Sequence, residues 1–339
     1  MLNASEWSMA RIETTAPLLV VVIDTEEEFD WSRPLARENV GVSAIRAQIK
    51  AHRIFERYAI RPTYVIDYPV ASQEDGWRPL AELHADGNCT VGAHLHPWVS
   101  PPYDELVSNF NSYPGNLPPA LEREKLRRLT ETIAARFGRP TVYKAGRYGV
   151  GAATAAILDQ HGYEIDASVV PESDFSPEEG PNFTAWPVAP YWFGGGRRLL
   201  ELPVTQAYVG WLSGARNVLR RPRQSGLGRA LRLPGVLART RAFERIRLSP
   251  EGMTFDELQR LTRALHAEGL RIFSFTYHSP SLAAGNTPYT PDEPALDRFL
   301  DRFRRYFDWF MGDLGGRAAD PGEILTFARA WSETAPLSQ

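Results

Sequence analysis

Two short runs of the sequence place acidic and imidazole side chains directly after apolar stretches. The run V-V-V-I-D-T-E-E-E contains Asp24 and Glu26, and the run V-G-A-H-L-H-P-W, seventy residues further on, contains His94 and His96. Residues i and i+2 of a strand point to the same side, so each pair is expected to share one face. An aspartate at the rim of a core needs a partner or a metal, and neutral imidazoles are common metal ligands. The two runs therefore predict a hydrolase that uses a divalent metal ion, with His94 and His96 on one ion.

Other polar side chains follow later predicted strands. His278 comes directly after the apolar run F-S-F-T-Y, and a histidine is a natural proton donor to a leaving group. Lys144 and Arg147 stand in Y-K-A-G-R-Y-G, where Arg147 could orient a carboxylate by a forked pair of hydrogen bonds. Asp166 and Ser168 in I-D-A-S-V-V-P also fall at a strand end and are candidates for substrate contact.

Tryptophans in predicted loops, among them Trp31 and Trp98, would offer flat platforms for sugar rings. The sequence contains neither a G-x-x-x-x-G-K-[ST] P-loop nor a G-x-S-x-G nucleophile motif. A glycosidase with a pair of carboxylates would leave the two neighbouring histidines without a role. Four further histidines in helical contexts are expected on the surface: His52, His84, His161 and His266.

Apolar runs that read as buried strands alternate along the chain with helical patterns. Strands are predicted over residues 17–24, 63–67, 88–94, 141–145, 163–169, 197–204 and 270–277. Helices are predicted over 40–58, 77–85, 119–137, 151–160, 254–267 and 295–310, and Thr254 and Glu257 form a capping box at the start of the fifth of these. This alternation favours a parallel sheet covered by helices. About seven units indicate a barrel, with a doubly wound open sheet as the alternative; in both, function collects at the carboxyl ends of the strands.

Composition is that of a globular protein, and we expect one domain over residues 1–339. The chain is 43% hydrophobic and 23% charged, and its net charge of −3 favours no particular partner, nucleic acid included. Its single cysteine, Cys89, excludes an intrachain disulfide and reads as a small core residue. The N-terminal residues lack a signal-peptide pattern, and the longest apolar run, residues 18–23, is too short to span a membrane. These features favour a cytoplasmic protein without a transmembrane segment.

One segment differs strongly from the rest of the chain in charge. Residues 211–250 contain ten arginines and one acidic residue, Glu244, with helix-breaking pieces such as L-P-G. The simpler interpretation is a solvent-exposed insertion in the domain. The sharper hypothesis is a basic surface for an anionic partner, such as a lipid-linked carrier, a charged glycan or a membrane surface.

Taken together, these motifs resemble those of the NodB-like polysaccharide deacetylases of carbohydrate esterase family 4. The resemblance is nearest to the WalW-like branch, which is associated with lipopolysaccharide biosynthesis. The pieces that carry it lie in the family's order between residues 18 and 300: I-D-T-E-E-E-F-D-W, G-A-H-L-H-P-W-V-S-P-P, Y-K-A-G-R-Y-G, G-Y-E-I-D-A-S-V-V-P and Y-H-S-P-S-L-A-A-G-N-T-P-Y. The resemblance implies a distorted (β/α)7 barrel, here with an Arg-rich insertion. It also implies metal-dependent removal of N-acetyl or O-acetyl groups from a sugar of a polysaccharide, lipopolysaccharide or lipid-linked glycan.

The family's site residues carry over to matching positions of this sequence. By resemblance, Asp24 is the catalytic base, His94 and His96 are the metal ligands, and His278 is the general acid. The family's second aspartate is replaced by Thr25, so Glu26 completes the ligand set, or Asp24 does so with Glu26 as the base. The family also spaces its two histidines at i, i+4, whereas here they are at i, i+2.

The arginine that orients the base in the family corresponds either to Lys144 or to Arg147, and we expect Arg147 to be catalytic. The expected metal is Zn²⁺. The expected substrate contacts are Trp31, Trp98, Lys144, Asp166 and Ser168. Two alternatives remain open from the sequence: an amidohydrolase that cleaves a non-sugar amide or ureide, and a non-catalytic relative that binds a glycan.

Overall fold

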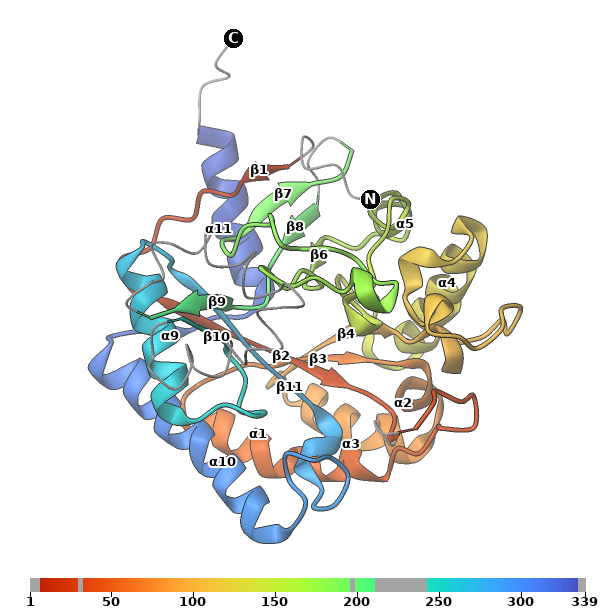
Figure 1. The fold of residues 1–339 in the computed structure, drawn as a ribbon, viewed down its shortest axis with the longest axis horizontal. Coiled ribbons are helices and arrows are strands. Elements are labelled where there is room, and N and C mark those ends of the chain that lie inside the picture. Colours follow the sequence, from red (N-terminus) through yellow and green to blue (C-terminus); the bar gives the residue numbers. More distant parts are fainter. Residues whose placement is uncertain (1–6, 30–32, 196–198, 211–242, 335–339) are drawn as a thin grey trace, which may run out of the picture.

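The computed structural model describes residues 7–29, 33–195, 199–210 and 243–334, and its centre is a curved parallel sheet (Figure 1). Within these residues, seven parallel strands lie in the order β8, β6, β5, β4, β3, β2, β11. The strands are β2 (Leu18–Thr25), β3 (Thr63–Ile66), β4 (Thr90–Leu95), β5 (Val142–Ala145), β6 (Ile165–Asp166), β8 (Leu199–Glu201) and β11 (Ile272–His278). The predicted α/β architecture is confirmed, and each of these seven strands overlaps one predicted strand, although β2, β4 and β11 each end one residue beyond the prediction.

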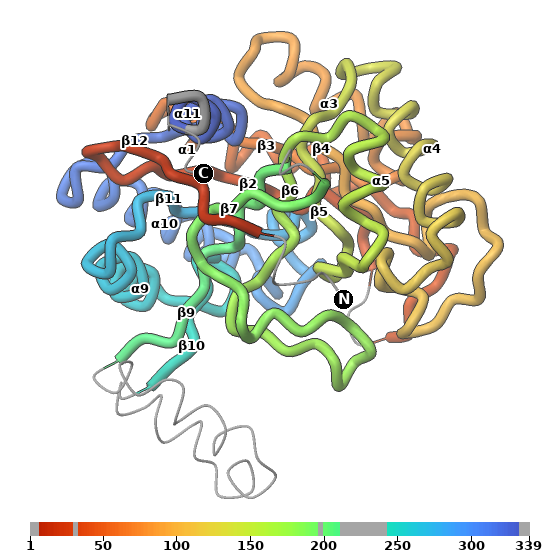
Figure 2. The backbone as a smooth tube through the Cα atoms, turned by 90° about the horizontal axis from the view of Figure 1, so that it is seen from above, coloured from red at the N-terminus to blue at the C-terminus, as the bar shows by residue number. Residues whose placement is uncertain are grey.

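Helices surround the sheet (Figures 1 and 2). They are α1 (Gln48–Arg57), α2 (Tyr68–Ser72), α3 (Glu74–Ala85), α4 (Pro119–Phe137), α5 (Thr154–Gln160), α9 (Phe255–Ala267), α10 (Glu293–Asp308) and α11 (Pro321–Thr334). The capping box predicted at the start of α9 is present, because Thr254 and Glu257 exchange hydrogen bonds between side chain and backbone. No helix in the described part of the chain has both the length and the apolar composition needed to cross a membrane.

Alternate residues of β2 belong to two different apolar clusters. Leu19, Val21 and Ile23 pack in the larger cluster, which includes side chains of the surrounding helices. Leu18, Val20 and Val22 pack in a smaller one together with residues of α11, namely Ile324, Leu325 and Ala328. The strand is therefore buried on both faces, as its unbroken apolar run predicts. The smaller cluster fills the space enclosed by the curved sheet, and Asp24 continues its alternation at the carboxyl end of β2.

Hydrogen bonds between strands do not close the sheet into a ring. Within the described ranges, β8 and β11 form no ladder with each other, and a separate antiparallel pair, β9 (Gln206–Val209) and β10 (Glu244–Arg247), lies at this seam. Thr276 N donates to Leu248 O (3.1 Å) and Ser274 N donates to Thr205 Oγ1 (2.8 Å), which ties β11 to the segments flanking β9 and β10. The predicted distorted (β/α)7 barrel is thus realised as seven parallel strands with an open seam.

Three short strands complete the fold. Strand β7 (Tyr191–Phe193) pairs antiparallel with β8, β1 (Ser8–Met9) pairs with β7, and β12 (Arg317–Ala318) pairs with β2.

Most of the predicted basic insertion, residues 211–242, lies outside the described residues, and its remainder contains β10. The surface position predicted for His52 is wrong: the side chain is fully buried, and its Nδ1 lies 2.9 Å from the hydroxyl of Tyr64.

Candidate metal centre and active site

The carboxyl ends of β2, β4 and β11 meet at one edge of the sheet, at a cavity of about 790 Å³. Five of the side chains that line it were predicted as site residues at strand ends: Asp24, Glu26, His94, His96 and His278. In the strand register His278 is the partner of Asp24, so these two residues from distant parts of the sequence sit side by side. The paired i, i+2 positions at the ends of β2 and β4 therefore deliver their side chains to a shared space, as the alternation of side chains on a strand predicts.

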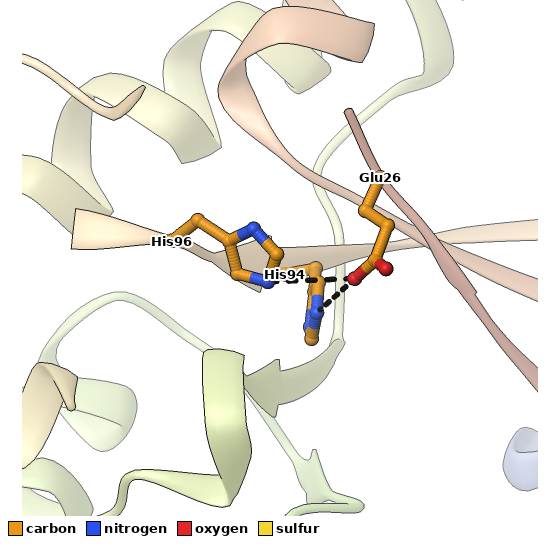
Figure 3. A group of neighbouring side chains, drawn as sticks. All are labelled: Glu26, His94 and His96. Carbon is orange, nitrogen blue, oxygen red and sulfur yellow. Dashed lines mark ion pairs between the residues drawn. The ribbon is translucent and has the colours of Figure 1, made fainter. Parts of the chain in front are cut away.

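Glu26, His94 and His96 form the best candidate metal site (Figure 3). Glu26 Oε2 lies 3.5 Å from Nε2 of His94 and 3.5 Å from Nε2 of His96. Zinc bonds of about 2.0–2.1 Å in tetrahedral geometry separate two ligand atoms by about 3.3–3.4 Å. The other oxygen, Glu26 Oε1, is buried and has no hydrogen-bond partner among the described residues, which leaves it free for a cation. The three side chains thus fit a divalent ion with an open position for water or substrate.

Hydrogen bonds on the far side of each imidazole aim the two rings at this point. His94 Nδ1 donates to the carbonyl oxygen of Lys144 (2.9 Å), so Nε2 carries the lone pair. His96 Nδ1 lies 2.7 Å from Glu27 Oε2. Burial lowers the pKa of His96 to about 4, which keeps this ring in the neutral form that binds metals. Both rings therefore turn Nε2 towards Glu26.

Glu27 belongs to the candidate site, although sequence reasoning did not select it. Its side chain is fully buried and accepts from Trp98 Nε1 at Oε1 (3.0 Å) while it faces His96 at Oε2. Its backbone N donates to Asp67 Oδ2 (2.6 Å), which fixes the backbone at this point. Glu27 stands beyond the end of β2, and its carboxylate meets the Nδ1 side of His96, whereas Glu26 faces the Nε2 side. The run of three glutamates was the only available signal.

Replacing Glu27 with glutamine is expected to weaken metal binding about 10- to 100-fold, the usual effect of losing a carboxylate that orients a ligating histidine. Two N–H groups, from His96 and Trp98, need two acceptor oxygens, and an amide offers only one. Burial raises the pKa of Glu27 to about 8, but a bound cation would favour its ionised form. Competition for zinc with a chelating dye measures the affinity. Glu122→Gln, a buried glutamate bonded to Thr154, is the matched control; equal affinities in wild type and Glu27→Gln would contradict this role.

Asp24 lies beside the metal ligands and is held by a lysine. Lys144 Nζ donates to Asp24 Oδ1 (2.5 Å) and to Thr276 Oγ1 (3.0 Å), and both charged side chains are almost fully buried. Burial alone would raise the pKa of Asp24, but the ammonium group of Lys144, with His94 and His278, outweighs it and lowers the pKa. Asp24 is therefore ionised at neutral pH and able to accept a proton.

His278 faces the second oxygen of Asp24. Its Nε2 lies 3.6 Å from Asp24 Oδ2, and its Nδ1 lies 2.7 Å from Glu251 Oε2. Burial alone would lower the pKa of His278, but Glu251, Glu26 and Asp24 together raise it well above its ordinary value. The imidazole is therefore protonated at neutral pH and holds a proton at the cavity wall.

The structure does not bring Arg147 to Asp24, the carboxylate it was expected to orient. Its Nη1 donates to Asn109 Oδ1 and Ser112 Oγ (2.6 Å each), and its Nη2 donates to Glu178 Oε2 (2.9 Å). Arg147 lines the outer cavity, whereas the side chain that contacts Asp24 is Lys144. Lys144 in turn has a side chain only 1% exposed, so it cannot serve as the substrate contact that was predicted.

The turn that carries Arg147 is conformationally unusual. Arg147 and Tyr148 both have positive φ angles, 50° and 60°, between Gly146 and Gly149. Non-glycine residues in this region are strained, and such strain is concentrated at functional sites. A Cβ atom on Gly146 would overlap the ring of His96. The glycine therefore lets the turn pack directly against a metal ligand.

Two other predicted contacts lie away from the cavity. Asp166 and Ser168 are fully buried and hydrogen-bonded to each other, and neither lines the cavity. Ile165 and Ala167 belong to the inner cluster, so Asp166 between them points to the opposite face of the sheet. Burial raises the pKa of Asp166 to about 6.

The two predicted tryptophan contacts have different outcomes. Trp98 lines the cavity but is only 2% exposed and stacks on His96 with ring centroids 4.3 Å apart. Its ring therefore supports the histidine more than it offers a surface to a sugar. Trp31 lies outside the described residues.

Comparisons with known proteins support the fold. No family model and no curated protein matches the sequence. Among solved structures, the chain is similar to a Mycobacterium smegmatis protein classed as a polysaccharide deacetylase, with a TM-score of 0.50 and 16% identity over 97% of this chain and 98% of the other. It is also similar to a Parabacteroides distasonis protein classed as a glycoside hydrolase/deacetylase, with a TM-score of 0.54 and 10% identity over 95% of this chain and 73% of the other.

A third solved structure extends the likeness to another activity. This structure is the 4-alpha-glucanotransferase of Thermococcus litoralis, with a TM-score of 0.51 and 11% identity over 91% of this chain and 40% of the other. Identities this low show a shared fold and no more, because one fold supports many chemistries. The function therefore has to be argued from the side chains in the cavity.

Proposed function

We propose that this protein, which has the NodB-like fold of solved polysaccharide deacetylases, is a metal-dependent hydrolase that removes acetyl groups from sugars. The expected substrate is an N-acetylated or O-acetylated sugar of a polysaccharide, lipopolysaccharide or lipid-linked glycan. The observation that carries the proposal is the juxtaposition of a metal-ligand set, an ionised aspartate and a protonated histidine in one cavity. Metal-assisted amide hydrolysis uses these three components, namely a Lewis acid, a general base and a general acid.

The residues that would hold the metal are Glu26, His94 and His96. Two imidazoles and one carboxylate match the ligand set of catalytic zinc sites, so zinc is the proposed ion. When bound, the ion would acidify a water molecule and polarise the carbonyl of the acetyl group. Glu27 and the Lys144 carbonyl hold the two imidazoles with Nε2 turned towards this position.

Asp24 and His278 supply the two proton transfers. Asp24 is the base that takes a proton from water as the water oxygen attacks the acetyl carbon. Lys144 keeps this carboxylate ionised and fixes its position through Oδ1. His278 is the acid that gives its Nε2 proton to the departing nitrogen as the carbon–nitrogen bond breaks, and Glu251 orients it from the other side. The products are acetate and a free amino sugar. Asp24 gains one proton and His278 loses one, so the site as a whole neither gains nor loses a proton.

Acetate release from N-acetylglucosamine oligosaccharides by the purified protein tests the proposal. We expect activity with stoichiometric zinc, loss of activity after a chelator removes it, and recovery when zinc is restored. A zinc-loaded protein that releases no acetate from any acetylated sugar would contradict the proposed reaction. A ureide substrate in the same assay distinguishes the deacetylase from an amidohydrolase that cleaves non-sugar amides.

The rate should depend on pH through His278. His278 must be protonated to act as the acid. Because its pKa is raised, kcat/KM should stay constant through neutral pH and fall as the pH rises past that pKa. Three carboxylates, those of Glu251, Glu26 and Asp24, raise the pKa of His278, and replacing Glu251 with glutamine removes the first of these charges. The alkaline limb of the pH–rate profile should therefore move to lower pH in Glu251→Gln. The control is Glu323→Gln, which changes a partly exposed glutamate outside the cavity. An unmoved alkaline limb in Glu251→Gln would remove His278 as the titrating acid.

A further inference from the structure

Among the arginines that line the same cavity, Arg247 has no charged partner in the described part of the chain. Arg247, at the end of β10, is half-buried at the cavity wall. Its Nε donates to Gln206 Oε1 (3.1 Å) and its Nη1 donates to the hydroxyl of Tyr148 (3.0 Å). Both partners are neutral, and no carboxylate within the described residues forms an ion pair with this guanidinium.

The partners of Arg247 hold it in one position. Gln206 is itself buried, and its amide nitrogen donates to Pro171 O (2.7 Å) and Ser173 Oγ (2.9 Å), so its oxygen must face the arginine. A half-buried positive charge without a counter-charge is unfavourable unless something supplies a negative group. A guanidinium fixed on one edge, with donors left over on the other, suits recognition of a phosphate or a carboxylate. The neighbouring Arg147 differs, because Glu178 already neutralises it.

Tyr148 connects Arg247 to the catalytic centre. The guanidinium carbon of Arg247 lies 5.4 Å from the centroid of the Tyr148 ring, and Lys144 Nζ lies 5.5 Å from the same centroid. Lys144 also contacts Asp24, so only one aromatic ring and one lysine link the base to the unpaired guanidinium. The Tyr148 ring thus lies within reach of both cations. A group bound at Arg247 would therefore belong to the reacting sugar or to its neighbour.

We infer that Arg247 is a specificity-determining residue that binds an anionic group, a phosphate or a carboxylate, next to the acetylated sugar. This inference rests on the proposed function and narrows its substrate to acidic acetamido sugars. The anion would accept hydrogen bonds from the free edge of Arg247, while Gln206 and Tyr148 keep the guanidinium in place.

The test compares acetate release from three substrates by the zinc-loaded full-length protein at fixed ionic strength. UDP-N-acetylglucosamine carries phosphate, a hyaluronan tetrasaccharide carries carboxylates, and chitotetraose is neutral. We expect kcat/KM for one of the acidic substrates to exceed that for chitotetraose at least about tenfold, and Arg247→Gln to reduce this ratio about 10- to 100-fold, mainly through KM. Arg247→Lys should retain part of the preference. Which acidic substrate is preferred identifies the anion.

The matched control is Arg271→Gln, because Arg271 is also partly buried and bonds only to neutral groups, the carbonyls of His266 and Leu270. It should leave the ratio unchanged. A wild type without preference for an acidic substrate, or a ratio unaltered in Arg247→Gln, would overturn the inference. Failure of all three substrates contradicts the proposed reaction instead. Calorimetric binding of the same sugars then decides: acidic sugars bound by wild type and lost in Arg247→Gln support the site, and equal binding overturns it.

Discussion

Replacing His94 and His96 together with alanine is expected to abolish stoichiometric zinc binding and to lower acetate release at least about 10³-fold. The change leaves Glu26 as the single ligand of the three, which cannot hold the ion at neutral pH. Both the attacking water and the developing oxyanion then lose the nearby positive charge. Metal analysis of the purified variant and an acetate assay measure the two effects on the same sample.

A matched double variant separates loss of ligands from loss of histidines in general. His84 and His266 lie outside the cavity, so His84→Ala with His266→Ala should keep both zinc and activity. Full acetate release by the His94/His96 double variant would defeat the metal assignment. Retained zinc with lost activity would place the ion elsewhere in the chain and would equally contradict it.

Replacing Asp24 with asparagine is expected to lower kcat about 10²- to 10⁴-fold while zinc remains bound, because the base is lost and the ligands are intact. The variant also leaves the ammonium group of Lys144 buried without a counter-charge, with Thr276 as its remaining side-chain partner. Breaking one side of such a buried pair costs about 3–5 kcal/mol of stability. Thermal unfolding and single-turnover acetate release measure the stability and the chemical step.

Two further variants show whether the lost activity is chemical or structural. Asp24→Asn combined with Lys144→Met removes both charges and should recover stability without recovering activity. Asp166→Asn changes a buried aspartate outside the cavity and should keep kcat within a few-fold of wild type. Recovery of kcat in the double variant, or normal kcat in Asp24→Asn, would rule out Asp24 as the base.

Much of the centre could be predicted because it depends on local strand geometry. Residues 18, 20 and 22 of β2 face the inner cluster, so Asp24 and Glu26 continue on the face that ends at the cavity. His94 and His96 obey the same rule on β4. His278 was predicted from the same kind of signal, a polar residue at the end of an apolar strand. Strand ends on one edge of a parallel sheet converge whatever lies between them in sequence.

The same rule, applied fully, would have removed two of the predicted contacts. Asp166 alternates with Ile165 and Ala167, which are inner residues, so its side chain and that of Ser168 point outward beneath the helices. Position at a strand end was not sufficient, because the phase of the alternation decides which face a side chain joins. Asp24 and Asp166 differ in phase and therefore in role.

Other parts of the site depend on contacts that no local pattern shows. Lys144 reaches Asp24 because β4 and β5 are neighbours with His94 opposite Lys144, whereas Arg147 falls in a turn beyond the strand. Glu251 meets His278 only because the segment after β10 packs beside β11. The seam between β8 and β11 was unpredictable for the same reason, since strand counting does not tell a closed ring from an open one.

Gly146 limits how far this pocket could be remodelled by protein engineering. A methyl group at that position would occupy the space of the His96 ring, whose aim at the cation tolerates displacements of only about 0.5 Å. The side chain of Arg147, which lines the cavity, could be exchanged to suit new ligands, provided that the replacement accepts a positive φ. No side chain larger than the hydrogen atom of glycine fits at position 146. Any library of variants built on this turn therefore has to keep glycine there.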